Sequence, residues 1–290
     1  MSRQFLEMPS PFANERGRIL LLEPVDSDRE SLQRQLLNEC YGRPFVIDDG
    51  ERRYLYFSVR LMQSAMLLKA PNALDLRYTQ AMMSFLLFLP QPRHLVLVGL
   101  GGGSLAKFCY HRLPGTRITA LEIDADVLDL GELFCLPPAG PRFEVLQRDG
   151  ADYFASAAKG IDVVLVDAFD QAGFAPALGN REFLQGVWDK LSGHGILVIN
   201  LAGDCETYAG IIGEAMAVFD DQVILIAVPD DGNHVLLAFK VRYFEPRWRW
   251  LQPFAKELRS RYGLDFPAFA AKLERSAKLG LARRESLRGR

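Results

Sequence analysis

Four glycines, Gly99, Gly101, Gly102 and Gly103, follow a short apolar stretch in the segment LVLVGLGGGSLAKF. Glycine lets the backbone turn tightly, and it brings N–H groups at the positively polarised start of a helix close to a ligand. We therefore predict that Gly99, Gly101 and Gly103 bind a cofactor. A glycine-rich turn without a ligand is the alternative that the loop alone leaves open.

Glu122 ends the next apolar stretch, in ALEIDAD. A carboxylate about 20 residues beyond such a loop can accept hydrogen bonds from both ribose hydroxyls of a nucleoside cofactor. A solvated strand end is the plainer interpretation. The dinucleotide pattern G-x-G-x-x-G would require glycine at position 104, where this chain has Ser104. The sequence therefore favours a nucleoside cofactor over the dinucleotide NAD.

Further carboxylates follow the next two apolar stretches. Asp149 and Gly150 come after the first, where a carboxylate can meet the adenine amino group, although Asp-Gly is also a common turn. Asp167 and Asp170 come after the second, in VLVDAFDQAG. Two carboxylates at the carboxyl ends of parallel strands can deprotonate an amine or hold a cation. The alternative is a pair that caps the following segment.

Strands and helices alternate through the region that carries these residues. The predicted strands are 94–98, 117–123, 143–146, 161–166 and 195–200, and the predicted helices are 104–113, 125–134, 151–158 and 181–191. Continuous apolar strands that alternate with helices are typical of a parallel sheet covered on both faces. A helix near 209–219 and two strands, 222–228 and 234–240, follow. The turn PDDGN between those strands is too short for a parallel crossover, so they form an antiparallel hairpin.

The residues before this region predict smaller elements. The segment 44–59 reads as a β-hairpin, and 74–89 reads as a buried helix stopped by Pro90 and Pro92. The first 25 or so residues could be a strand or a loose tail, because their pattern is mixed. We expect three parts: a β-rich element at 1–73, a nucleoside-binding domain at 74–245 and a helical extension at 246–290.

Composition excludes several function classes. The chain has 290 residues, a formal net charge of -2 and 49% hydrophobic residues, which is ordinary for a soluble globular protein. This balance gives no reason to expect a nucleic acid or a membrane as partner. The four cysteines are scattered and lack metal-ligand spacing, so we expect no metal site and a reducing, cytoplasmic location. A basic cluster beside Trp248 and Trp250 is better explained as a surface helix than as an RNA contact.

Together these motifs resemble the spermidine synthase family of aminopropyltransferases, from about Pro44 to Lys240. The resemblance implies an α/β fold with a class I S-adenosylmethionine-dependent methyltransferase-like (Rossmann-like) sheet, an antiparallel terminal hairpin and a small N-terminal β element. It also implies transfer of an aminopropyl group from decarboxylated S-adenosylmethionine to a small amine or polyamine, without a metal. A homodimer or homotetramer is the implied assembly.

The resemblance assigns roles residue by residue. Asp167 would take the proton from the attacking amine, and Asp170 would help to hold that amine. Gln63 and Tyr78 look like the family's Gln and Tyr beside the nucleoside and amine pockets, although their spacing is longer here. Glu122, Asp149 and Gly150 would contact the nucleoside.

The chain also departs from the family pattern. Gly102 stands where the family's glycine loop has an Asp that grips the aminopropyl ammonium, Gln171 replaces a proline, and Thr79 replaces a His or Gln. Without that Asp, the carboxylate of ordinary S-adenosylmethionine would be tolerated better. We therefore keep three hypotheses: an aminopropyltransferase, a methyltransferase that uses S-adenosylmethionine, and a non-catalytic nucleoside-binding protein of the same fold.

Overall fold

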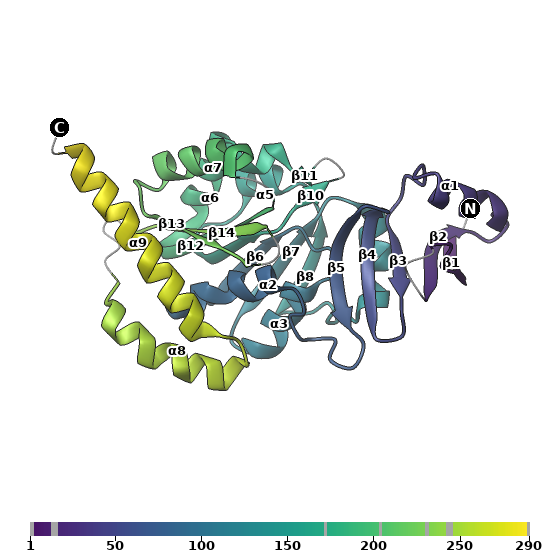
Figure 1. The fold of residues 1–290 in the computed structure, drawn as a ribbon, viewed down its shortest axis with the longest axis horizontal. Coiled ribbons are helices and arrows are strands. Elements are labelled where there is room, and N and C mark those ends of the chain that lie inside the picture. Colours follow the sequence, from purple (N-terminus) through teal and green to yellow (C-terminus); the bar gives the residue numbers. More distant parts are fainter. Residues whose placement is uncertain are drawn as a thin grey trace.

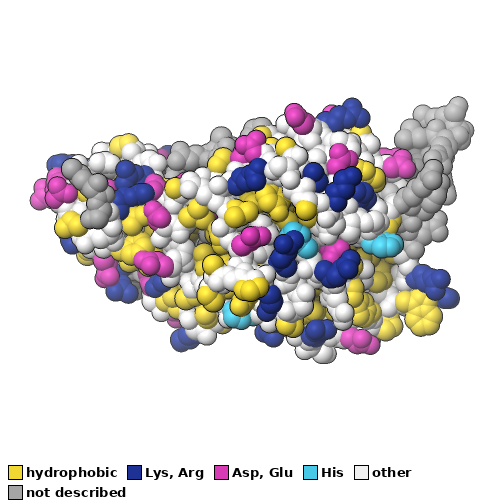
Figure 2. Space-filling model, turned by 180° about the vertical axis from the view of Figure 1, so that it is seen from behind, with side chains coloured by type: hydrophobic (Ala, Val, Ile, Leu, Met, Phe, Trp, Pro, Cys, Tyr) yellow, Lys and Arg dark blue, Asp and Glu magenta, His cyan; other side chains and the backbone are white. Residues whose placement is uncertain are grey.

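The computed structural model describes residues 3–12, 17–170, 173–202, 205–229, 232–241 and 246–288. A small sheet lies at one end of the molecule, a large sheet occupies the middle, and two C-terminal helices cover the other end (Figure 1). Among the described residues, no helix is both long and apolar enough to cross a membrane. Basic and acidic side chains are interspersed on the face shown in Figure 2.

The small sheet contains five antiparallel strands in chain order. They are β1 (Arg3–Pro9), β2 (Arg18–Pro24), β3 (Phe45–Asp48), β4 (Arg52–Ser58) and β5 (Leu61–Leu67), with α1 (Arg29–Leu37) between β2 and β3. The hairpin predicted at 44–59 is confirmed as β3 and β4, and the undecided first residues form β1 and β2. Ile19, Leu21 and Leu36 are fully buried between α1 and the sheet, because alternate strand positions face the helix.

The large sheet has seven strands in the order β13-β14-β12-β9-β6-β7-β8. The parallel strands are β6 (His94–Val98), β7 (Arg117–Glu122), β8 (Phe143–Gln147), β9 (Ile161–Val166) and β12 (Leu191–Ala202). The antiparallel pair is β13 (Val223–Ala227) and β14 (Asn233–Phe239). The fold class is confirmed, including the terminal hairpin, although Asp230 and Asp231 of its turn lie outside the described residues.

Helices cover both faces of this sheet (Figure 1). One face carries α2 (Arg77–Met82), the 3-10 helix η1 (Met83–Leu87), α3 (Ser104–Arg112), α8 (Trp248–Tyr262) and α9 (Phe266–Arg288). The other face carries α5 (Gly150–Ser156), α6 (Arg181–Lys190) and α7 (Cys205–Val218). Successive strand residues face opposite layers, so the central strands are apolar throughout, as predicted for a sheet covered on both sides.

Two predicted helices are only partly α-helical. The segment 74–89 becomes α2 followed by η1, and 125–134 becomes α4 (Ala125–Leu130) followed by the 3-10 helix η2 (Gly131–Phe134). Every residue of η1 is buried, so its path is set by packing on all sides, a constraint that helical spacing does not reveal. The remaining short elements are β10 (Phe169–Asp170), β11 (Gly173–Phe174) and the 3-10 helix η3 (Pro176–Gly179). The division into three parts remains a prediction.

Candidate nucleoside-binding active site

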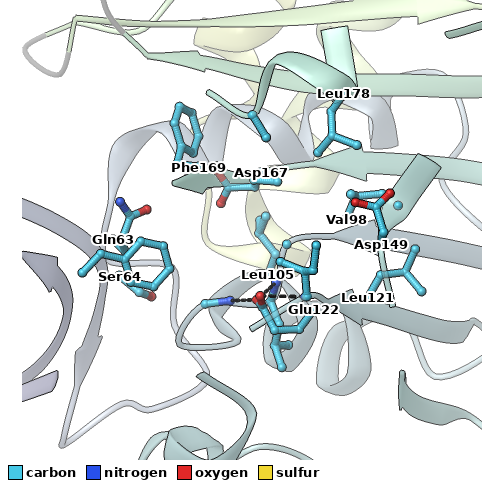
Figure 3. Close-up of a pocket in the computed structure, with 18 of the residues that line it drawn as sticks. Gln63, Ser64, Val98, Leu105, Leu121, Glu122, Asp149, Asp167, Phe169 and Leu178 are labelled. Carbon is cyan, nitrogen blue, oxygen red and sulfur yellow. Dashed lines mark hydrogen bonds between the residues drawn. The ribbon is translucent and has the colours of Figure 1, made fainter. Parts of the chain in front are cut away.

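A pocket of about 280 Å³ lies at the carboxyl ends of the parallel strands β6, β7, β8 and β9. Strand order reverses between β6 and β9, and ligands of open α/β sheets bind at such a reversal. The volume is near the lower end of the ~300–1,000 Å³ typical of small-molecule sites. Strand β5 of the small sheet closes one side of the pocket with Gln63 and Ser64 (Figure 3).

The glycine loop turns sharply between β6 and α3. Gly99 has φ +90°, and a Cβ there would lie 2.2 Å from the backbone oxygen of Asp167. Only glycine permits this approach, which brings the end of β6 against the end of β9. Gly101 has φ +51° and lines the pocket together with Gly99. Gly103 has φ +68° and is the N-cap of α3, where it packs against Leu136 outside the pocket lining.

Glu122 is buried at the end of β7 and accepts four backbone hydrogen bonds. Its Oε2 accepts from the N–H groups of Leu100 at 3.0 Å and Gly101 at 3.3 Å. Its Oε1 accepts from Ile123 at 2.9 Å and Asp124 at 3.0 Å. The loop amides that would cradle a phosphate in a dinucleotide site are therefore directed at a carboxylate. This carboxylate repels a phosphate and accepts hydrogen bonds from hydroxyls, so the site suits a nucleoside better than a nucleotide.

Asp149 directly precedes α5 and is its N-cap. Its Oδ1 accepts hydrogen bonds from the N–H groups of Ala151 at 2.7 Å and Asp152 at 3.3 Å, which leaves Oδ2 for a ligand. Gly150 is buried, and a Cβ there would lie 2.6 Å from Cγ1 of Val98. Both residues line the pocket, beside the apolar side chain of Leu178. Figure 3 shows Asp149, Val98 and Leu178 on the side of the pocket away from Gln63.

Asp167 follows β9 and projects into the pocket from the sheet (Figure 3). Its Oδ1 accepts a hydrogen bond of 2.9 Å from Nδ2 of Asn200 on β12, and Tyr78 on α2 also hydrogen bonds to the carboxylate. Burial raises the pKa of Asp167 to about 6, and the two hydrogen bonds oppose that rise. A carboxylate with this pKa is ionised at neutral pH and is a stronger base than an exposed one.

The remaining predicted residues lie around the same pocket or outside the described side chains. Gln63 and Tyr78 both line it. Asp170 is the last residue of β10, and its side chain lies outside the described part of the structure, as does Gln171. Among the described residues, no group of three or more His, Cys, Asp or Glu side chains is placed to hold a metal ion.

Sequence reasoning missed several polar residues of the site, among them Arg148, Ser64 and Asn200. Ser64 lines the pocket beside Gln63, and Asn200 hydrogen bonds to Asp167 from the end of β12. A polar residue that ends the apolar stretch GILVIN is a usable signal for Asn200, because the other strands of this sheet also end at the pocket.

Comparisons with known proteins identify the family. A family model described as "Spermine/spermidine synthase domain" matches residues 75–216. The polyamine aminopropyltransferase of Chromobacterium violaceum is 34% identical over 232 residues, which cover 80% of this chain and 89% of that protein. The chain belongs to the spermine/spermidine synthase family.

Solved structures agree with this family in fold. A probable spermidine synthase from Corynebacterium glutamicum has a TM-score of 0.61 at 19% identity, covering 79% of this chain and 91% of that one. Human methyltransferase-like protein 13, solved with SAH, has a TM-score of 0.54 at 25% identity, covering 70% and 93%. The spermidine synthase resemblance inferred from the motifs is therefore confirmed, and the fold is shared with a methyltransferase.

Gly102, which is expected from the sequence to replace an Asp of the family's loop, has close neighbours where a side chain would project. A Cβ at this position would lie 2.7 Å from Oγ of Ser64 and 3.0 Å from Cδ1 of Phe134. Gly102 itself is not among the pocket-lining residues, whereas Ser64 is. The space that a side chain at position 102 would enter is thus occupied by a hydroxyl from β5.

Proposed function

We propose that this chain transfers an aminopropyl group from decarboxylated S-adenosylmethionine to a small amine or polyamine. The observation that carries the proposal is Asp167, a carboxylate in the pocket wall whose pKa is raised to about 6 by burial. An amine that is protonated at neutral pH has no lone pair for attack, so the reaction needs a base at this point. The membership of the spermine/spermidine synthase family supports the same activity.

The pocket residues suit such a donor. Glu122 would accept hydrogen bonds from the ribose hydroxyls in place of some of its four backbone N–H bonds, and Oδ2 of Asp149 would accept one from the adenine amino group. Val98, Leu121 and Leu178 supply apolar surface on the side of Asp149 (Figure 3). Gln63, on the opposite side, would face the tail of the donor, and Gly99 and Gly101 would lie along it. Gly150 would let the adenine approach the backbone closely.

In the proposed reaction, Asp167 takes one proton from the acceptor ammonium, and the freed lone pair attacks the carbon next to the donor sulfur. The new C–N bond forms as the C–S bond breaks, and the sulfur keeps the electron pair and becomes a neutral thioether. The sulfonium donor supplies a leaving group that is already activated. Tyr78 would hold the acceptor beside Asp167, and Asp170 would attract its positive charge.

The decisive experiment is incubation of the protein with each donor and a panel of mono-, di- and triamines, followed by mass spectrometry. Aminopropyl transfer releases methylthioadenosine, whereas methyl transfer releases S-adenosylhomocysteine. We expect methylthioadenosine in the presence of an amine, and its loss in Asp167→Asn. Methylthioadenosine release that persists in Asp167→Asn would refute the assignment of the base.

A methyltransferase that uses ordinary S-adenosylmethionine is the second candidate, and one observation favours it. Gly102 and Ser64 put no carboxylate at the place where the family's Asp grips an ammonium, so the donor carboxylate meets less repulsion. S-adenosylhomocysteine release without methylthioadenosine would establish this alternative. Binding of either nucleoside without turnover would indicate a non-catalytic family member.

We further propose the division into 1–73, 74–245 and 246–290, and a homodimer or homotetramer as the assembly. Limited proteolysis would test the boundaries, since cleavage concentrates in exposed connections between compact parts. Light scattering coupled to gel filtration would give the number of copies. A monomer at micromolar concentration would contradict the proposed assembly.

A further inference from the structure

Three polar side chains end an otherwise apolar face of the large sheet. On the face covered by α2 and η1, β9 presents Val163 and Leu165 before Asp167, and β12 presents Ile196 and Val198 before Asn200. Asn233 continues the same face on β14, because it pairs with Ala202, two residues beyond Asn200. The three side chains therefore lie side by side on neighbouring strands.

These three side chains form a chain of two hydrogen bonds, and both bonds are donated toward Asp167. Nδ2 of Asn233 donates to Oδ1 of Asn200 at 2.9 Å, and Nδ2 of Asn200 donates to Oδ1 of Asp167 at 2.9 Å. Asn200 is 1% exposed and Asn233 is 8% exposed, so water reaches neither amide freely. Each bond is therefore made in surroundings where an unpaired polar group would be unfavourable.

The direction of the first bond fixes the second. An asparagine amide can present either its NH2 group or its oxygen to a neighbour, and the oxygen would repel a carboxylate. Because Asn233 donates to the Asn200 oxygen, the Asn200 NH2 group must face Asp167. That contact fixes the position of Oδ1 against β12, while Tyr78 hydrogen bonds to the same carboxylate.

We propose that Asn233 is a positioning residue that acts on Asp167 through Asn200. It keeps the Asn200 amide in the orientation that donates to the carboxylate. This hydrogen bond stabilises the ionised form of Asp167 and fixes the orientation of its carboxylate. This role rests on the proposed function of Asp167 as the base. Asn233 itself is not among the residues that line the pocket.

Other groups near Asp167 also influence its pKa, and their effect must be distinguished from that of the two asparagines. Tyr78 of α2 hydrogen bonds to the same carboxylate. The described ionisable residues that share its pocket are Glu122, Arg148 and Asp149 from the ends of β7 and β8, while β5 contributes the neutral Gln63 and Ser64. Substitutions of Asn200 and Asn233 by leucine leave all of these charges unchanged, so a changed titration reports on the amides.

The test is a direct titration of the Asp167 carboxyl by NMR in protein labelled at the aspartate carboxyl carbons, with Asp167→Asn to assign the signal. We expect Asn200→Leu to raise the titration midpoint by about one pH unit or more, because the charged form loses its donor. Asn233→Leu should raise it in the same direction by a smaller amount. The double variant should titrate like Asn200→Leu alone.

The coupling between the two variants decides the proposal. An unchanged midpoint in Asn233→Leu would overturn it, and so would independent, additive shifts in the double variant. Asn38→Leu, at the exposed end of α1, is the matched control and should leave the midpoint where it is. Far-UV circular dichroism and thermal unfolding of each variant test whether global unfolding causes a shift in the midpoint.

A kinetic measurement separates this inference from the proposed function. If methylthioadenosine release is observed, the acid limb of its pH profile should move with the NMR midpoint in each variant. If the NMR coupling holds and no turnover is found with any amine, the proposed function fails while the amide chain stands. A pH profile that stays fixed while the NMR midpoint moves would show that Asp167 is not the base.

Discussion

The Cβ position of Gly102 points directly at Ser64, with 2.7 Å to its Oγ and 3.0 Å to its Cβ. Ser64 lies on β5 of the small sheet, whereas Gly102 lies in the loop between β6 and α3, and a larger side chain at either position would enter the same volume. We therefore expect the residue tolerated at position 102 to depend on the residue at position 64.

We expect Gly102→Asp alone to destabilise the protein by about 1–3 kcal/mol, because the new side chain meets Ser64 and Phe134. Ser64→Gly should recover much of this loss in the double variant, since both contacts to Ser64 disappear. Thermal unfolding measures the effect, and Ser64→Gly alone is the control. Equal destabilisation in the single and double Gly102→Asp variants would contradict the linkage.

The same double variant should change donor preference. A carboxylate at the donor tail would favour decarboxylated S-adenosylmethionine over S-adenosylmethionine by about tenfold to a hundredfold relative to the parent protein. Calorimetric titration with both donors gives the ratio of the two Kd values. An unchanged ratio would mean that position 102 does not face the donor tail.

Asp167→Asn should lower the rate of product release by about a hundredfold or more, because a positioned base typically contributes that much.

Asp167→Asn should also stabilise the fold above pH 6. The folded pKa of Asp167 is raised to about 6, so the folded state binds the proton more tightly and becomes less stable as the pH rises through this value. Chemical denaturation at pH 4 and pH 8 compares the two proteins, and we expect a gain of about 1–2 kcal/mol at pH 8 only, discounted for partial exposure.

Glu122→Gln should weaken the binding of either donor by about tenfold to a hundredfold. The amide group has only one oxygen with which to receive the loop N–H groups and the ligand hydroxyls, whereas the carboxylate has two. Glu144→Gln is the matched control, since Glu144 accepts a hydrogen bond from Thr119 and does not line the pocket. Equal affinities in Glu122→Gln and the parent protein would remove Glu122 from the ribose site.

Lys107 offers a prediction about stability and pH. Its side chain is fully buried on α3, its Nζ donates to the backbone oxygen of Phe134 at 2.7 Å, and burial lowers its pKa to about 8. The unfolded state binds this proton more tightly, so stability should rise with pH between about 8 and 10. Between pH 7.5 and 10 the rise should be about 2 kcal/mol larger in the parent protein than in Lys107→Met. Denaturant titrations at both pH values measure the difference, and parallel pH dependences would contradict it.

Much of the fold follows from local patterns. The strands 94–98 and 161–166 were predicted at the bounds that the structure shows, because turn residues on both sides of a continuous apolar run mark where the strand begins and ends. The 3-10 geometry of η1 could not be predicted in this way, since it results from packing against elements distant in the chain.

Some residues of the site could likewise be predicted from local sequence, and others could not. Glu122 and Asp167 were predicted because each follows an apolar run at a strand end, and both line the pocket, while their roles remain predictions. Asn200 lies 33 residues from Asp167 in the sequence, so no local sequence pattern predicts their hydrogen bond. The orientation of its amide depends on a third strand and is visible only in three dimensions.

The origin of the pocket residues has a consequence for how this protein can change. Asp167 is held by amides that belong to the interior of the large sheet, whereas Gln63 and Ser64 come from the separate N-terminal sheet. Substitutions in β5 can therefore change which molecules the pocket accepts while the Asp167 carboxylate keeps its place. The part of the pocket that selects a ligand and the part that holds the buried carboxylate can thus diverge independently.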